Sequence, residues 1–183
     1  HFAVKNGESV SPGIAFTAAS TMKIPIMVST LWREDLPLDE TISGWLNYMI
    51  VLSENDPADR LMEQIDPVRG PLLITADMQS LGLENTFISG FFYLGAPLLS
   101  INTTEANSRL DINLKPDLYN QTTTSDIGSL LASIYDCAEN GQGNLIEISN
   151  GKINREKGQL MISILSRNQI GALIEAGLPE GTQ

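Results

Sequence analysis

A helix begins in the stretch Ala18-Ala19-Ser20-Thr21-Met22-Lys23-Ile24-Pro25, and two of its side chains could carry chemistry. The spacing of apolar residues predicts a helix from Ser20 to about Arg33, with Thr17 or Ser20 as its cap. Ser20 and Lys23 are three residues apart, so they share one helix face, one turn from each other. A serine hydroxyl is a weak nucleophile unless a base takes its proton. A lysine can be that base when burial lowers its pKa.

The same pair also fits a purely structural interpretation. Ser20 would cap the helix and Lys23 would be an ordinary solvated lysine. A serine followed three residues later by a lysine is common by chance, so this motif alone does not decide between the two interpretations.

A second polar motif, Ser53-Glu54-Asn55, lies further along the chain. It follows a helix predicted over residues 41–52, which is so apolar that we expect it to be buried. It precedes another helix, predicted to start near Pro57. In isolation the motif could be a capping segment, in which Ser53 or Asn55 accepts hydrogen bonds from the first N–H groups of that helix.

Together the two motifs resemble those of the class A β-lactamase and penicillin-binding protein superfamily of serine enzymes. In that family the serine and lysine open one apolar helix, and the serine and asparagine lie in a loop after a later helix. Two more stretches are similar to the family. Residues 121–131 resemble the threonine-rich entry to the helix that follows the omega loop, and residues 172–182 resemble the segment before the third motif.

The resemblance implies an α+β fold, with a helical part from about residue 18 to 140 packed on an antiparallel sheet. It implies that Ser20 is the acylated nucleophile and that Lys23 is its proton partner. Ser53 would carry a proton to the leaving nitrogen, and Asn55 would hydrogen-bond the substrate amide. The implied substrates are β-lactams, D-Ala-D-Ala peptides of peptidoglycan or small esters. The resemblance implies no metal or cofactor, and it implies an extracytoplasmic location.

Two features of that family are missing from the sequence. Class A enzymes activate the deacylating water with an omega-loop glutamate, but Glu105 is the only glutamate between residues 86 and 121, and it lacks the expected Leu-Asn after it. We therefore expect slow deacylation and inefficient turnover of β-lactams. The third motif, of Lys-Thr-Gly type, is also absent. We expect a single domain over residues 1–183 that is truncated at both ends, with most of the sheet supplied by another segment or chain.

The amino-acid composition argues against several other classes of function. The 183 residues are 42% hydrophobic, which suits one globular domain with its own core. A single histidine, His1, and a single cysteine, Cys137, leave little for a zinc site or a histidine-dependent triad. The formal net charge of -11 disfavours nucleic acid and anionic membrane surfaces as partners. No apolar run is long enough to span a membrane.

Two other functions stay open on the residues alone. One is a catalytically silent cell-wall or ligand-binding module with the same fold, and the other is a helical scaffold in which both motifs are caps. The aromatic run Phe91-Phe92-Tyr93 could line a cleft or pack in the core. Residues 86–123 read as a long loop. The remaining expected elements are a strand near residues 1–6 and helices over residues 71–81, 126–138, 156–167 and 170–176.

Overall fold

The structure, a computed structural model, describes residues 4–5, 8–9, 13–112 and 115–169. The helix expected over residues 170–176 lies outside them. In chain order the described α-helices are α1 (Lys23–Arg33), α2 (Glu40–Val51), α3 (Asn55–Ile65), α4 (Gly70–Ser80), α5 (Thr124–Asn140), α6 (Asn144–Ile148) and α7 (Arg155–Leu165). A short 3₁₀ helix, η1 (Ala19–Met22), leads directly into α1. This order confirms the predicted helices apart from α6, which the sequence analysis missed.

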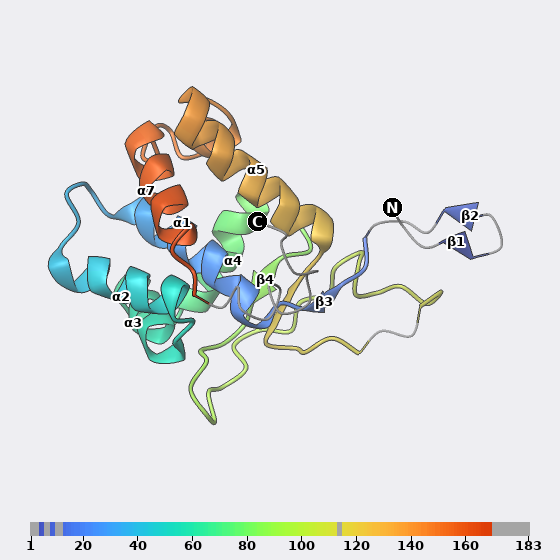
Figure 1. The fold of residues 1–183 in the computed structure, drawn as a ribbon. Helices are drawn as coiled ribbons and strands as arrows, with labels where there is room; N and C mark the ends of the chain where they lie inside the picture. Colours follow the sequence, from blue (N-terminus) through green and yellow to red (C-terminus); the bar gives the residue numbers. More distant parts are fainter. Residues whose placement is uncertain (1–3, 6–7, 10–12, 113–114, 170–183) are drawn as a thin grey trace, which may run out of the picture.

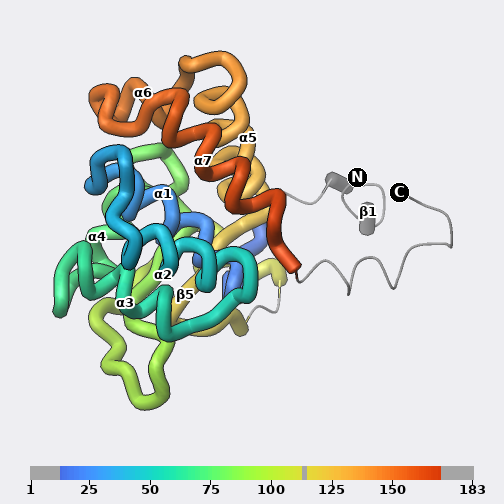
Figure 2. Tube along the Cα trace, turned by 60° about the vertical axis from the view of Figure 1, so that its left-hand side comes forward, coloured from blue at the N-terminus to red at the C-terminus, as the bar shows by residue number. Residues whose placement is uncertain are grey.

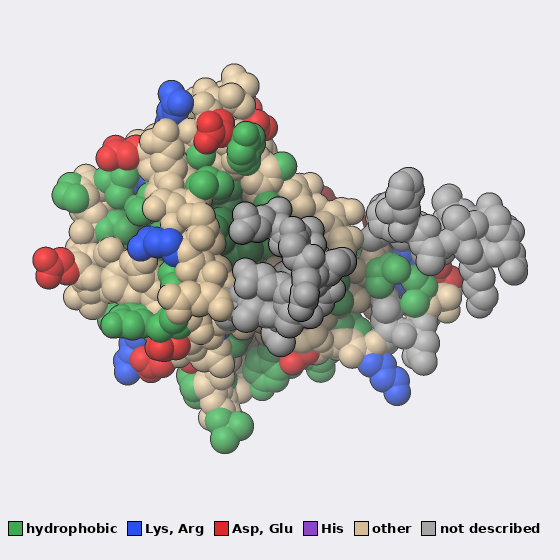
Figure 3. Space-filling model, viewed as in Figure 1, with side chains coloured by type: hydrophobic (Ala, Val, Ile, Leu, Met, Phe, Trp, Pro, Cys, Tyr) green, Lys and Arg blue, Asp and Glu red, His purple; other side chains and the backbone are tan. Residues whose placement is uncertain are grey.

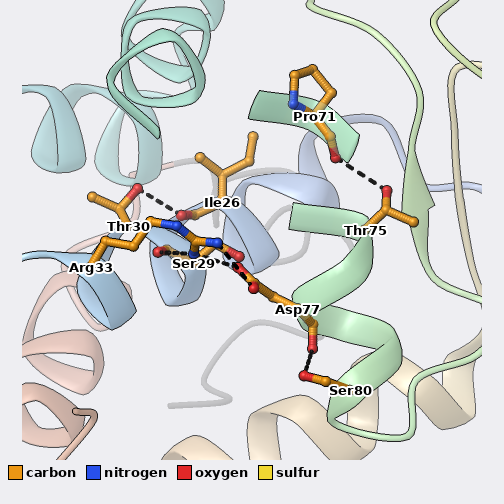
Figure 4. Close-up of polar contacts among 8 residues, drawn as sticks. All are labelled: Ile26, Ser29, Thr30, Arg33, Pro71, Thr75, Asp77 and Ser80. Carbon is orange, nitrogen blue, oxygen red and sulfur yellow. Dashed lines mark hydrogen bonds and ion pairs between the residues drawn. The ribbon is translucent and has the colours of Figure 1, made fainter. Parts of the chain in front are cut away.

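Helix α1 lies at the centre of the helical part and contacts α2, α3, α4 and α7 (Figure 1). Most of its residues are buried, including polar ones. The buried Ser29 Oγ has no hydrogen-bond partner among the described residues, whereas other polar side chains of the helix have one. Thr30 Oγ1, for example, donates a hydrogen bond of 2.8 Å to the carbonyl of Ile26 (Figure 4). At the end of α1, Arg33 forms an ion pair of 2.6 Å with Asp77 of α4 (Figure 4).

Helices α5, α6 and α7 form a group beside α1 and α2 (Figure 2). Helices α5 and α7 approach closely because Gly158 has no side chain. A Cβ atom there would lie 2.7 Å from the backbone nitrogen of Ala138 and 2.9 Å from Cys137 Sγ. Cys137 is fully buried in this contact, where it packs as a small core side chain.

A three-stranded antiparallel sheet lies beside the start of α1. Its order is β3 (Phe16–Thr17), β5 (Asn120–Thr122), β4 (Phe87–Ile88), with Phe16 opposite Thr122 and Ile88 opposite Asn120. The sequence analysis assigned residues 86–123 to a loop and missed β4 and β5, because strands of two or three residues show no measurable alternation. Near the start of the chain, β1 (Val4–Lys5) pairs with β2 (Glu8–Ser9), where a strand was expected.

Two local expectations were wrong. The stretch 41–52, expected to be buried, is not buried throughout, since Tyr48 is 53% exposed and Leu52, just after α2, is 43% exposed. The helix predicted over residues 126–138 begins earlier, at Thr124, and its cap is Thr123, whose hydroxyl accepts from the backbone N–H of Asp126 at 3.1 Å. The sequence of a single helix does not show which of its sides other elements cover or at which residue its first turn begins, because both depend on tertiary contacts.

The surface carries acidic and basic side chains scattered among polar ones, without a basic patch on the face drawn in Figure 3. The segment that follows β4 projects from the body (Figure 1), and Leu94 in it is fully exposed. Within the described ranges, no helix combines the length and apolar character that a membrane span requires.

Candidate active site

Three short segments bring the predicted residues together. Ser20 lies in η1, Lys23 is the first residue of α1, and Ser53 lies in the turn between α2 and α3. The sequence analysis expected an α-helix from Ser20 onward, whereas the structure forms a 3₁₀ turn first. A 3₁₀ helix has about three residues per turn, so residues three apart lie almost directly above one another. This turn therefore places Ser20 and Lys23 closer to alignment than an α-helix would.

The amine of Lys23 and the two serine hydroxyls form a closed triangle. Lys23 Nζ lies 3.2 Å from Ser20 Oγ and 3.0 Å from Ser53 Oγ, and the two hydroxyl oxygens are 2.9 Å apart. The same amine also donates to the carbonyl oxygen of Ser53. All three sides of the triangle are within hydrogen-bond distance. A proton can therefore pass between any two of these groups without a rearrangement of the backbone.

Lys23 is buried, whereas Ser20 is exposed. The Lys23 side chain is 2% exposed, and burial lowers its pKa below the ordinary value of 10.5, opposed by the negative charges of Asp59 and Glu54. Its Nζ also lies 5.6 Å from the centre of the Phe92 ring. Burial disfavours the ammonium form because the charged amine loses its water. The structural interpretation required a solvated Lys23, so it is excluded. The site instead places the exposed hydroxyl of Ser20 beside the buried amine of Lys23.

The capping interpretation of both motifs is also wrong. Neither η1 nor α1 begins with a side-chain hydrogen bond, so neither Thr17 nor Ser20 caps them. Helix α3 begins at Asn55 without a side-chain cap from Ser53 or Asn55. The hydroxyls of Ser20 and Ser53 instead point to each other and to Lys23.

Left-handed backbone conformations flank the triangle. Ala19, just before Ser20, has a φ of 46°, and Ser53 itself has a φ of 57°. For residues other than glycine this conformation costs on the order of 1–2 kcal/mol each, so the surrounding structure must hold it in place. Ala19 is held by Asn120 of β5, whose Oδ1 accepts its N–H at 2.7 Å. The turn at Ser53 is held by the N–H of Glu54, which donates to the carbonyl of Tyr48 at 3.3 Å.

We expect Asn120→Ala to destabilise the protein by about 1–2 kcal/mol, because the Ala19 N–H loses its acceptor while its strained conformation remains. Asn120→Asp is the matched control, since a carboxylate oxygen can accept the same N–H. Urea unfolding of the two variants measures the difference. An equal loss in both variants would contradict the role assigned to this hydrogen bond.

A depression of about 330 Å³ opens beside the triangle. It is lined by Ser20, Thr21, Lys23, Ile24, Met49, Ile50, Ser53, Leu165 and Asn168. The segment after α7 is tied to the end of α2 at its rim, because Asn168 donates to the Ile50 carbonyl at 2.6 Å. Three other hollows, of about 370 to 490 Å³, lie elsewhere on the described surface, and none of them is lined by a lysine.

Among the described residues, neither Asn55 nor Glu105 is hydrogen-bonded to the triangle. Asn55 is exposed at the first turn of α3, and its side chain forms no hydrogen bond to any described residue, so its role in substrate binding stays a prediction. Glu105 is exposed and lines a separate hollow together with Arg109. It does not line the depression at Ser20.

Two residues that support the site, Asn120 and Asp59, were not identified from the sequence, and a third, Phe92, was named there only as a residue of either a cleft or the core. Asn120 holds the turn before Ser20, Asp59 acts on Lys23 through its charge, and Phe92 covers the Lys23 amine. Only Asp59 could have been noticed in the sequence, because a charged residue next to Ala58 on the apolar side of a predicted helix is unusual. For Phe92 the cleft interpretation and the core interpretation were left open. The structure places Phe91 in the core and Phe92 at the site.

The fold is that of class A β-lactamases. A β-lactamase from Streptosporangium roseum superimposes with a TM-score of 0.61 at 19% identity, over 96% of this chain and 66% of that one. A β-lactamase from Desulfarculus baarsii gives 0.60 at 18% identity, over 94% and 63%. A variant of the reconstructed class A enzyme of the last common ancestor of Gram-negative bacteria gives 0.59 at 20%, over 95% and 66%. The chain therefore spans slightly less than two thirds of the length of these structures.

The family follows from the sequence match. Residues 29–183 match the model of the β-lactamase enzyme family, and the chain belongs to that family. The matched range begins after Lys23, so the assignment of Ser20 and Lys23 depends on the geometry described above. No curated protein sequence matched the chain.

The part of the chain that the structure describes holds no group of three or more His, Cys, Asp or Glu side chains arranged to bind a metal ion.

Proposed function

We propose that the protein is a serine acyl-transfer hydrolase of the β-lactamase type that forms an acyl-enzyme on Ser20. The observation that carries the proposal is the triangle of Ser20, Lys23 and Ser53 around a buried amine. Family membership and fold support the general class of serine hydrolase.

Acylation would proceed through the three sides of the triangle. Neutral Lys23 takes the proton of the Ser20 hydroxyl, whose oxygen attacks the substrate carbonyl carbon and forms the new C–O bond. As the tetrahedral intermediate collapses, the bond to the leaving nitrogen or oxygen breaks. Ser53 gives its proton to that atom and receives one from the Lys23 ammonium, so the amine is neutral again. A positioned base of this kind contributes about 100–10,000-fold to rate.

The start of the helix would stabilise the negative charge that develops on the carbonyl oxygen. The N–H of Ser20 belongs to the first turn of η1 and has no acceptor among the described residues, whereas the N–H groups of Ala19 and Thr21 donate to Asn120 Oδ1 and to the Ala18 carbonyl. The positive end of the helix dipole also lies there. The free N–H of Ser20 suits an oxyanion next to the Ser20 oxygen.

The acyl-enzyme is expected to be long-lived. Within the described residues, the only hydrogen-bond partners of the Ser20 and Ser53 hydroxyls are each other and Lys23, and no carboxylate reaches either of them. A deacylating water would therefore lack a base of its own. We propose β-lactams, D-Ala-D-Ala peptides or small esters as substrates and an extracytoplasmic location, with Asn55 as a substrate contact.

The test is covalent labelling of the protein with a fluorescent penicillin and with a fluorophosphonate. We expect an adduct by intact mass, located on Ser20 by peptide mapping, that persists for minutes or longer after excess probe is removed. Absence of label from both probes, or label at another residue, would refute the proposal and favour a catalytically silent binding module. Rapid, sustained hydrolysis of a chromogenic cephalosporin would contradict the slow deacylation.

A further inference from the structure

The Lys23 amine has one side that faces no polar group. Its three hydrogen-bonding directions go to Ser20 Oγ, Ser53 Oγ and the Ser53 carbonyl. The ring of Phe92 lies over the amine, with 5.6 Å from Nζ to the ring centre. Water is therefore excluded from this side by an aromatic ring that belongs to a segment about 70 residues away in sequence.

A buried carboxyl group holds the Phe92 segment in place. Asp59, on the side of α3 that faces the core, is 7% exposed, and its Oδ1 accepts the backbone N–H of Phe92 at 2.7 Å. On either side of Phe92, the rings of Phe91 and Tyr93 stack with centroids 5.8 Å apart. Phe91 is buried in the core, so the segment is anchored both by packing and by Asp59.

We propose that Phe92 and Asp59 form a positioning pair for Lys23, in which the ring closes the amine off from water and the Asp59 carboxyl holds the ring over it. Neither residue touches the reacting atoms, so both act through Lys23. Their role in acylation rests on the proposed function, whereas their effect on the protonation of Lys23 does not.

The two members have opposite effects on the pKa of Lys23. A ring face attracts an ammonium group far more weakly than the water that it displaces, so the ring favours the neutral amine. The charge of Asp59 favours the ammonium form. Glu54, in the turn before α3, acts in the same direction as Asp59.

Asp59 itself is subject to several charges and donors. Burial raises its pKa, and the charges of Glu63 and Asp56 on α3 act in the same direction, while the N–H groups of Phe92 and Tyr93 lower it. A substitution that removes the charge of Asp59 but keeps its oxygen acceptor therefore separates its electrostatic effect from its effect on the position of Phe92. Asparagine meets both conditions.

The test is a pH titration of the Lys23 side chain by ¹³C NMR at Cε, with Lys23→Met to assign the signal. Phe92→Ala admits water, so its midpoint should lie above that of the wild type. Asp59→Asn keeps the oxygen that accepts the Phe92 N–H but loses the negative charge, so its titration midpoint should lie below that of the wild type. Phe92→Leu keeps an apolar cover and should move the midpoint less than Phe92→Ala. Leu94→Ala, at a fully exposed position of the same segment, is the matched control and should not move it.

Labelling rates at neutral pH should follow the midpoints. Phe92→Ala should be labelled at least about tenfold more slowly than the wild type, because a rise of one unit in the pKa of Lys23 lowers the neutral fraction of its amine about tenfold. Asp59→Asn should label faster than the wild type. Midpoints that do not move, or that move in the same direction in both variants, would overturn the positioning pair. If Phe92→Ala fails to fold, Phe92→Leu and Asp59→Asn still decide the question.

The two proposals fail in distinguishable ways. If the midpoints shift as expected while the wild type forms no adduct, the proposed function fails and the positioning pair stands. If the wild type labels on Ser20 while the midpoints of all variants coincide, the positioning pair fails and the proposed function stands.

Discussion

Ser20→Ala should abolish covalent labelling by both probes and should leave the free energy of unfolding within about 0.5 kcal/mol of the wild type. Labelling is lost because the hydroxyl oxygen that forms the acyl bond is removed. Stability is retained because Ser20 is exposed and caps no helix. Intact mass after incubation with probe and urea unfolding of the same samples measure the two effects.

Ser125→Ala is the matched control for this substitution. Ser125 is also exposed and also lies in the first turn of a helix, α5, but it does not contact the triangle. The control should label at the wild-type rate. Residual labelling of Ser20→Ala, or a loss of stability of the size that removal of a cap produces, about 1 kcal/mol, would contradict the assigned role.

Lys23→Met should slow labelling by about 100–10,000-fold, because the base of the triangle is lost. Methionine has a side chain of similar length without a charge, so it can fill the same buried space. We expect little change in stability near neutral pH, since the lost hydrogen bonds are offset by the removal of a buried amine. Time courses of labelling and urea unfolding at several pH values test both statements.

The pH dependence of stability should change with a definite sign. The pKa of Lys23 lies below 10.5 in the folded chain, so between these two values the unfolded chain binds more protons. The free energy of unfolding of the wild type therefore rises with pH across this interval, and Lys23→Met should lose part of that rise.

Lys157→Met is the control, because Lys157 is 4% exposed and burial lowers its pKa as well. Its amine donates to the carbonyl of Lys152 and not to a serine, so this variant should also lose part of the pH dependence but should label normally. If Lys23→Met labels at the wild-type rate, or if Lys157→Met loses labelling to the same extent, the special role of Lys23 is refuted.

The helices and the two polar motifs could be identified from the sequence because they depend on local patterns. Apolar spacing gave the approximate bounds of α1 to α5 and α7, since a repeat over ten or more residues is a strong signal. The three-residue separation of Ser20 and Lys23 fixed their common face in any helical conformation. The joint presence of Ser53-Glu54-Asn55 then indicated the family, which the match over residues 29–183 shows.

Only the tertiary structure decided what these residues can do. Whether Lys23 is a base depends on its burial, and that burial comes from Ser53, Phe92 and the helices packed around α1. The left-handed turn at Ala19 depends on Asn120, about 100 residues later, and the strand that carries Asn120 is too short to leave a pattern. A sequence determines local conformation through neighbours along the chain, whereas a pKa and a strained turn are set by groups that only folding brings within a few ångströms.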